Sequence, residues 1–497
     1  MAITVCGTSA ESQAACSNGV MTADPDAIPY PPPFRWVKRL LVAAVVYVLS
    51  LAAVWVGWHW VAAARVDAAR AAIRAAGHPA TADELTPAPS VPDVENAALA
   101  WGRAAAARKP KVYSPAESNL VYPDYPPFPP AWHDLADKAV AANGPAYAAA
   151  RQARAMKRAD WGITLSRTNF NIGHLNPMRG LANQLGDAAL HAHVRGDDLA
   201  AIERSRDILA QARALTAGPT LMSQLISAGV NALATNRLAA IAPGLRLKSN
   251  DDDDDPLRAS VRATIAELLD VAPDRAAYAR AMRTEVAMVG EWLQAEAGLP
   301  RILRPAVEMR HAEHLHRMNA AADAATEPDR PAVERKLRPA AQPPAGKREL
   351  LLPRGLRNDL AGRSTEMILR VEGARRMTAV SLAAQLYRAD HDGRWPAKLD
   401  DLVPRYLPAV PQDTHGDAAP LGYALLDDGR RPIVYSRGPD GADDIAAGWR
   451  PPREPSYGWM TEYSAKQGTG ARDQWHDLTR FMPPAPPSTA EATADQP

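Results

Sequence analysis

The stretch that decides the architecture of this chain is LLVAAVVYVLSLAAVWVGWHWVAAA, residues 40–64. It contains no Asp, Glu, Lys or Arg, and only Ser50 and His59 interrupt its apolar run. A helix rises about 1.5 Å per residue, so this segment is long enough to cross a hydrocarbon core of about 30 Å with some tilt. Tryptophans lie near both ends, as expected at the two headgroup layers: Trp36, Trp55, Trp58 and Trp60. We therefore predict that Leu40–Ala64 is a transmembrane helix in contact with a lipid bilayer.

The same apolar run could instead belong to a cleaved secretory signal, because Ala62, Ala63 and Ala64 offer a small-residue cleavage site. The apolar region of a signal peptide is about 7–15 residues long and follows a short charged start. Here the run is longer and begins only at Leu40, which favours an anchor that is retained. Basic residues flank both ends, so the positive-inside rule does not choose an orientation: Arg35, Lys38 and Arg39 before the run, and Arg65, Arg70 and Arg74 after it.

Composition limits the classes of function. The chain of 497 residues has 57 basic and 56 acidic residues, and this balance argues against a nucleic-acid surface. The only two cysteines, Cys6 and Cys16, precede the anchor, where two free thiols are favoured over a disulfide. Ala-rich runs favour helix, because Ala loses no side-chain entropy there. Proline reaches 45 residues and clusters in stretches typical of linkers.

These patterns predict a mainly α protein with a single transmembrane helix, an array of α-helical hairpins and a small C-terminal α+β module containing a β-hairpin. Asp93 is the expected N-cap of a short helix after the anchor. The predicted segments are a disordered tail (1–34), the anchor helix (35–77), a Pro-rich linker with a short helix (78–131), the helical array (132–338), a linker (339–355), the module (356–449) and a disordered tail (450–497).

Within the array, apolar residues recur at helical spacing between residues 181 and 242, and two breaks interrupt them. Gly196-Asp197-Asp198 is expected to end one helix and cap the next, and Ala217-Gly218-Pro219-Thr220 to do the same. Helix, tight turn and helix at this length is similar to tetratricopeptide-like hairpins. Further helices are expected at 257–270, 275–298 and 306–325. The acidic run Asp251–Asp255 reads as a solvated loop, because a calcium loop would space its Asp residues and include a Gly.

The C-terminal module carries the most specific local pattern. A helix from about Leu356 to Asp390 precedes the turn Asp392-Gly393-Arg394-Trp395-Pro396. Tyr406-Leu407-Pro408 and Val410-Pro411-Gln412-Asp413 follow, and then two expected strands, Gly422 to Leu426 and Pro432 to Ser436, joined at Asp427-Asp428-Gly429. The final loop reads Tyr435-Ser436-Arg437-Gly438-Pro439-Asp440-Gly441 and closes on Asp443-Asp444-Ile445.

This order resembles the periplasmic domain of the major pseudopilins of type II secretion systems, over about residues 365–449. The resemblance implies a domain outside the cytoplasm, and thus an N-terminus inside. It also implies calcium at Asp440, Asp443 and Asp444, whereas a plain polar turn needs no metal. The chain departs from that family: no prepilin-peptidase site precedes the anchor, and the anchor has no acidic residue near its start. The order of anchor, helical hairpins and terminal module resembles a group of membrane-anchored bacterial envelope proteins, and we expect such a protein rather than a filament subunit.

A second candidate site is the group Glu308, His311, Glu313, His314 and His316. Glu-x-x-His occurs in di-iron bundles, but there on two separate helices. Here both copies fall on one helix and point to different faces. His311 and His314 share a face and offer a transition-metal site, whereas a charged, solvated helix face is the simpler interpretation.

No catalytic motif emerges from the sequence. The leading functional hypothesis is an interaction or scaffold protein of the inner membrane, which uses a helical surface to bind an envelope protein partner and has no nucleic-acid partner. One alternative is a metal-dependent hydrolase or another enzyme whose site is assembled from distant residues. The other is a component associated with secretion or pilus machinery.

Overall fold

The structure is a computed structural model that describes most of the chain and is mainly helical. The described residues are 34–85, 90–109, 128–163, 165, 172–249, 255–295, 302, 304–327, 329–337, 360–426, 429, 431–438, 443, 445–446 and 478–481. They fall into two units, one within Met1–Val61 and the other within Ala62–Pro497.

The first long helix is α1 (Arg35–Ala75), and it is long and apolar enough to cross a membrane. Its large apolar side chains from Leu40 to Val61 are mostly exposed; Leu41, for example, is 60% exposed. In the second unit, Val66 and Ile73 of the same helix are buried in a hydrophobic cluster with Met282 and Leu315. A second apolar helix, Leu221–Gly244, has 67% of its most hydrophobic window buried, so it is a core helix of the second unit.

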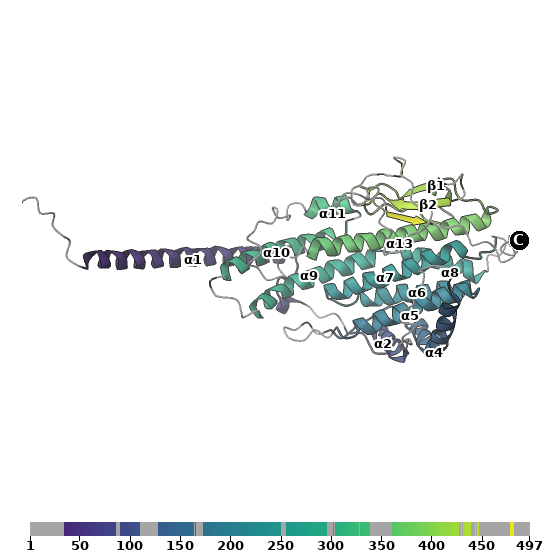
Figure 1. Ribbon diagram of the computed structural model, residues 1–497, viewed down its shortest axis with the longest axis horizontal. Coiled ribbons are helices and arrows are strands. Elements are labelled where there is room, and N and C mark those ends of the chain that lie inside the picture. The colour runs from purple at the N-terminus through teal and green to yellow at the C-terminus, as the bar shows by residue number, and fades with distance from the viewer. Residues whose placement is uncertain are drawn as a thin grey trace, which may run out of the picture. The chain divides into compact units, whose positions relative to one another are not determined.

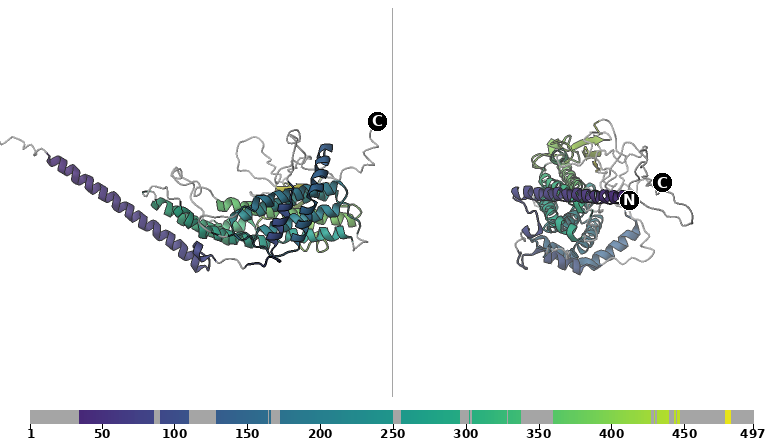
Figure 2. Two further views of the ribbon diagram at one scale, coloured as in Figure 1. Left: turned by 90° about the horizontal axis from the view of Figure 1, so that it is seen from below. Right: turned by 90° about the vertical axis from the view of Figure 1, so that its left-hand side faces the viewer.

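Helical hairpins form the centre of the second unit (Figure 1). α5, α6 and α7 pack on one another in sequence order, while α2 and α4 pack together beside α5 in the views of both Figure 1 and Figure 2. Their bounds are α2 (Ala97–Ala107), α4 (Pro130–Arg154), α5 (Leu175–Val194), α6 (Asp198–Leu215) and α7 (Leu221–Ile241). The helical periodicity predicted for 181–242 is therefore confirmed.

Both predicted breaks have the expected chemistry. Gly196 adopts φ +92°, which favours a residue without Cβ, and Asp197 accepts a hydrogen bond from the backbone N–H of Ala200 at 2.9 Å. Thr220 caps α7 by accepting from the N–H of Ser223. Each of these two turns thus ends on a residue whose side chain accepts a hydrogen bond from a free N–H group in the first turn of the next helix.

The predicted cap at Asp93 is wrong. The N-cap of α2 is Asn96, whose Oδ1 accepts from the N–H groups of both Ala98 and Asp160, at 3.0 and 2.9 Å. Its Nδ2 donates to the carbonyl of Asp160. An amide side chain can donate and accept at once, so Asn96 links the start of α2 to the segment after α4. An ionised carboxylate such as that of Asp93 can only accept hydrogen bonds.

The remaining helices are α8 (Pro256–Leu269), α9 (Ala272–Ala295), α10 (Arg304–Ala324), α11 (Arg330–Leu337) and α13 (Leu360–Asp390). Asp255, the last residue of the acidic run, is the N-cap of α8, while 251–254 lie outside the described residues. α13 packs against both α7 and α8. Its residues Met377, Val380 and Leu386 belong to the same hydrophobic core as the hairpins, so the helix of the C-terminal module shares the core of the array.

A small antiparallel sheet lies against α13. β1 (Gly422–Leu426) and β2 (Arg431–Ser436) pair with Tyr423 opposite Val434, and their bounds match the predicted hairpin within one residue. β3 (Leu478–Phe481) pairs with the other edge of β2, although the sequence places these residues in a disordered tail. The short 3-10 helix η6 (Leu399–Leu402) contributes Leu399 and Leu402 to the main core.

Candidate functional site

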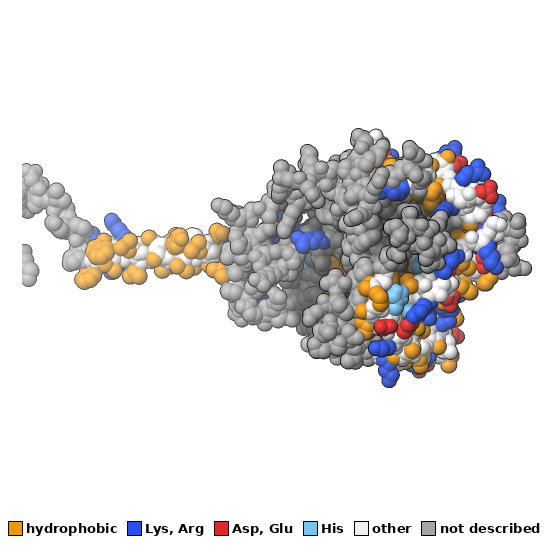
Figure 3. All heavy atoms as spheres, turned by 45° about the vertical axis from the view of Figure 1, so that its right-hand side comes forward, with side chains coloured by type: hydrophobic (Ala, Val, Ile, Leu, Met, Phe, Trp, Pro, Cys, Tyr) orange, Lys and Arg blue, Asp and Glu red, His pale blue; other side chains and the backbone are white. Residues whose placement is uncertain are grey.

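A solvent-open groove lies between α4, α6 and α8, with a volume of about 780 Å³. Apolar side chains supply one part of its wall, and charged or polar side chains supply the rest. The apolar part consists of Tyr147, Ala148, Leu199, Ala200, Pro256 and Ala259. The polar part consists of Arg151, Asp197, Glu203, Arg204, Arg206, Asp207 and Ser260. On the described part of the face drawn in Figure 3, basic, acidic and apolar side chains lie side by side.

Ion pairs link the three helices across this groove. Arg151 and Arg154 of α4 both pair with the carboxylate of Asp207 on α6, at 2.9 and 3.0 Å. Glu203 accepts hydrogen bonds from Arg154, from Arg206 at 2.7 Å and from the hydroxyl of Ser260 on α8 at 2.5 Å. The groove is therefore built from tertiary contacts between helices that are distant in sequence.

The electrostatic balance differs between the two carboxylates. Burial raises the pKa of Asp207, which is 1% exposed, against the opposing effect of Arg151. Burial acts in the same direction on Glu203, but hydrogen bonds from Ser260, Arg154 and Arg206 outweigh it and lower the pKa of Glu203 to about 2. Glu203 is thus a stable anion that holds the arginines around it in fixed positions.

Arg204 differs from the other arginines of the groove. Its Nη1 donates to the carbonyl of Ala188 at 2.7 Å, and its guanidinium lies 5.6 Å from the centre of the Tyr147 ring. No carboxylate of the described residues lies within ion-pair distance of it. Burial lowers the pKa of Arg204, as expected for a cation without a full counter-charge. Arg204 is therefore the cation of the groove that can accept an anionic ligand.

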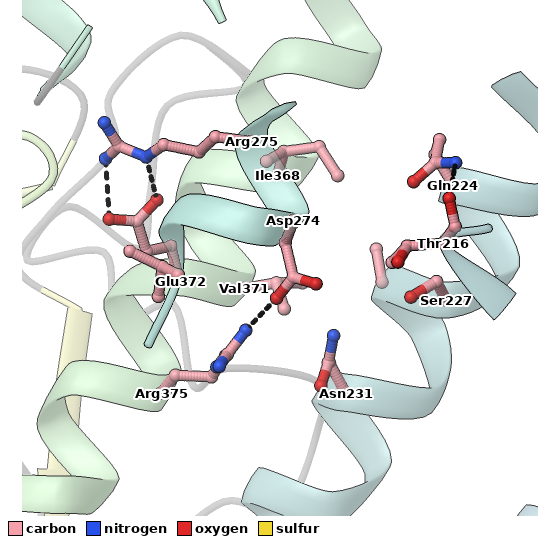
Figure 4. Close-up of a pocket in the computed structure, with 12 residues that line it drawn as sticks. Thr216, Gln224, Ser227, Asn231, Asp274, Arg275, Ile368, Val371, Glu372 and Arg375 are labelled. Carbon is pink, nitrogen blue, oxygen red and sulfur yellow. Dashed lines mark hydrogen bonds and ion pairs between the residues drawn. The ribbon is translucent and has the colours of Figure 1, made fainter. Parts of the chain in front are cut away.

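A second, smaller cavity of about 30 Å³ lies between α7, α9 and α13, next to the end of α6 (Figure 4). Two ion pairs line it: Arg275 with Glu372 at 2.6 Å, and Arg375 with Asp274. Gln224 donates to the carbonyls of Thr216 and Gly218 at its edge. A space of this size is too small for an organic substrate, so this cavity is a structural feature of the core.

A third group brings a serine, a histidine and two carboxylates together. The Nδ1 of His415 lies 3.3 Å from the Oγ of Ser436, and its Nε2 lies 3.5 Å from a carboxylate oxygen of Glu366. Asp413 lies on the other side of Ser436, with 2.5 Å between its Oδ1 and the serine Oγ. The distances resemble those of a nucleophile, a base and an orienting acid.

In the observed geometry, the hydrogen bonds of this cluster are not those of a nucleophile activated by a base. The hydroxyl of Ser436 donates to Asp413 rather than to His415, and it accepts from the N–H of Gly438. Asp413 also accepts from the N–H groups of His415 and Arg437. Ser436 and Asp413 are both 0% exposed. This cluster therefore ties the segment at 413–415 to β2 and α13 as part of the fold.

The predicted calcium site is only partly covered by the structure. Asp440 and Asp444 lie outside the described residues. Asp443 accepts hydrogen bonds from the hydroxyl of Tyr435 at 3.1 Å and from the N–H of Ala446 at 2.8 Å. Among the described residues no group of three or more His, Cys, Asp or Glu side chains is arranged to hold a metal. Calcium binding at Asp440, Asp443 and Asp444 stays a prediction, tested by the melting temperature of the full chain with calcium and with a chelator.

The histidine group on α10 is not a solvated face, so that interpretation is wrong for two of its members. His311 is 5% and His314 7% exposed, whereas His316 is exposed. Burial, followed by the positive charge of Arg70 for His311 and of Arg317 for His314, lowers the pKa of each imidazole to about 4. Both rings are therefore neutral near pH 7, packed in the core beside Leu315.

The groove does not follow from the sequence alone, because its residues come from three helices. The available signal was the spacing of Arg151 and Arg154 on one helix and of Glu203 and Asp207 on another, each pair on one helical face. No protein-family model, no curated protein and no solved structure matches this chain. Function is therefore inferred from the groove and the anchor themselves.

Proposed function

We propose that this chain is a membrane-anchored interaction protein of the bacterial envelope, whose helical array binds another envelope protein. The groove between α4, α6 and α8 carries the proposal, because it combines an open apolar wall with a cation, Arg204, that has no carboxylate partner among the described residues. Apolar surface together with a few placed polar groups is the usual composition of a binding site.

The anchor supports the same proposal. Apolar residues of α1 from Leu40 to Val61 are exposed, as in a helix that contacts lipid. Val66 and Ile73 are buried beside α9 and α10, so the end of the helix is packed into the second unit. A binding surface tethered in this way meets its partners at the membrane, where tethering raises their effective concentration.

Site-specific photocrosslinking in intact membranes tests the proposal. A photoreactive side chain at Ala148, which is exposed in the groove, should yield a discrete crosslinked partner. The matched control is Met222, which is 47% exposed and does not line the groove. Equal labelling at both positions, or no crosslink at Ala148, Leu199 and Ala259, would reject the groove as a partner-binding surface.

Localisation is part of the proposal: the inner membrane, with the N-terminus inside and the bulk of the chain outside the cytoplasm. A reporter fused after Pro497 should be active only outside the cytoplasm. The mature protein should keep residues 1–64, because the apolar run is too long for an ordinary signal. A mature N-terminus at Arg65 would show instead that the protein is exported without its anchor.

Association with secretion or pilus machinery is a second candidate function. It is supported by the order of α13, η6 and the β1–β2 hairpin, which follows the order expected from the pseudopilin-like pattern. Crosslinking at Arg394, an exposed residue after α13, would capture a component of the secretion platform if this candidate is correct. Crosslinks confined to Ala148 would favour the groove instead.

A further inference from the structure

Arg204 determines what chemistry the groove can recognise. One guanidinium nitrogen is occupied by the carbonyl of Ala188, and the group lies against the ring of Tyr147. Guanidinium groups have five N–H donors, so Arg204 retains donors for an incoming oxygen anion. The neighbouring arginines are already engaged: Arg151 by Asp207, and Arg206 by Glu203 and Glu267. Arg204 is therefore the position in the groove at which one additional negative charge can be balanced.

The surroundings of Arg204 select among anions. Asp197, Glu203 and Asp207 also line the groove, so a phosphate carrying nearly two negative charges would meet stronger repulsion than a singly charged carboxylate. Tyr147, Leu199 and Pro256 offer apolar surface to whatever carries the anion. The favoured ligand thus combines one carboxylate with an apolar body.

We propose that the groove between α4, α6 and α8 binds a carboxylate carried on an apolar body, with Arg204 as its cation and Tyr147 against the apolar part. The source of the carboxylate rests on the proposed function. We take it to be an acidic side chain or the chain terminus of the protein partner. A free organic acid offers the same chemistry, and the two sources are separated experimentally below.

Direct binding uses the full chain in detergent and three small probes. Benzoate carries the charge and the apolar ring, benzamide carries the ring without the charge, and acetate carries the charge without the ring. Saturation-transfer NMR should detect benzoate, and titration should show at least about tenfold weaker binding of benzamide and acetate, because a charge-assisted hydrogen bond or the ring contact is lost. Equal binding of benzoate and benzamide would overturn the proposal.

Variants assign the binding to Arg204. Arg204→Met should weaken benzoate about tenfold and leave benzamide unchanged, whereas Arg204→Lys should retain most of the preference for the anion. The matched control is Arg213→Met, a change on the same helix at a residue whose side chain is 47% exposed and which does not line the groove. Unchanged benzoate binding by Arg204→Met would overturn the proposal, since benzamide binding reports that the groove is intact.

The source of the carboxylate is decided by the crosslink at Ala148. If the partner supplies it, Arg204→Met and an excess of benzoate should each reduce that crosslink, while benzamide should not. A crosslink that neither treatment changes would reject this inference and leave the proposed function standing. Benzoate binding without any crosslink at Ala148 would reject the protein partner and identify a free organic acid as the ligand.

Discussion

The groove between α4, α6 and α8 and the polar contacts of α13 use the same kinds of side chain with opposite results. On α13, Glu366 lies beside His415, Glu372 pairs with Arg275, and Arg375 pairs with Asp274. Each of these three charges has a counter-charge inside the fold, which for Glu366 is also Arg370 at 2.8 Å. In the groove, Arg204 has none among the described residues, and the space beside it is open. A ligand site therefore depends on an unmatched charge together with solvent access, and not on the residue types themselves.

The strongest test of this contrast is Glu372→Ala. The carboxylate of Glu372 is 3% exposed and pairs with both Arg275 and Arg376. Its removal leaves two arginines without their counter-charge in the core, so the free energy of unfolding should fall by about 3–5 kcal/mol in denaturant titrations. The matched control is Arg335→Ala, which breaks the exposed pair with Asp417 and should cost about 1 kcal/mol or less. Equal losses would remove the distinction between the buried and exposed pairs.

Asp413→Ala should have the next largest effect. Asp413 accepts from the hydroxyl of Ser436 and from the N–H groups of His415 and Arg437, so the substitution leaves buried donors without an acceptor. The free energy of unfolding should fall by about 1–3 kcal/mol, measured by chemical denaturation. Ser436→Ala should cost less, because it removes one hydroxyl. A Ser436→Ala variant that is fully stable but loses a hydrolytic activity would show instead that the cluster is catalytic.

The contribution of Asp198, which lies on the same helix as Arg204, to the free energy of unfolding should depend on pH. Burial opposes its ionisation, but hydrogen bonds from His193 and Arg246 outweigh burial and lower the pKa of Asp198 to about 2. Because the folded pKa lies below the unfolded value of about 3.9, this contribution is present above about pH 4 and is lost as the pH falls towards 2. Asp198→Asn should therefore cost about 2 kcal/mol at pH 6 and much less near pH 2. A cost that does not depend on pH would refute the assignment.

The smallest effect on stability is expected for Arg204→Met. The methionine keeps the apolar stem against Tyr147, while the half-buried cation that it removes has no ion-pair partner among the described residues. Thermal unfolding should place the variant within about 1 kcal/mol of the original chain. A loss as large as that of Glu372→Ala would mean that Arg204 is part of the fold, as the charges of α13 are.

Local elements were largely predictable from the sequence. The hairpin strands at 422–426 and 432–436 follow from apolar residues around a Gly-containing turn, and the helix breaks at Gly196 and Thr220 follow from local capping chemistry. The cap of α2 was not predictable, because Asn96 is selected by its hydrogen bonds with Asp160, which lies 64 residues away. The burial of His311 and His314 was missed for the same reason, since a charged helix sequence does not reveal which neighbours cover it.

The apolar helix, the order of the elements and the mainly helical class follow from the sequence, because these depend on spacing and composition within short windows. Which charges find a counter-charge depends instead on how the helices pack. Arg151, Arg154, Arg204 and Arg206 look alike in sequence, yet the packing of α4 and α8 against α6 supplies carboxylate partners for three of them. Arg204 is left against Tyr147 in an open groove, because counter-charges from distant segments are assigned by how helices pack.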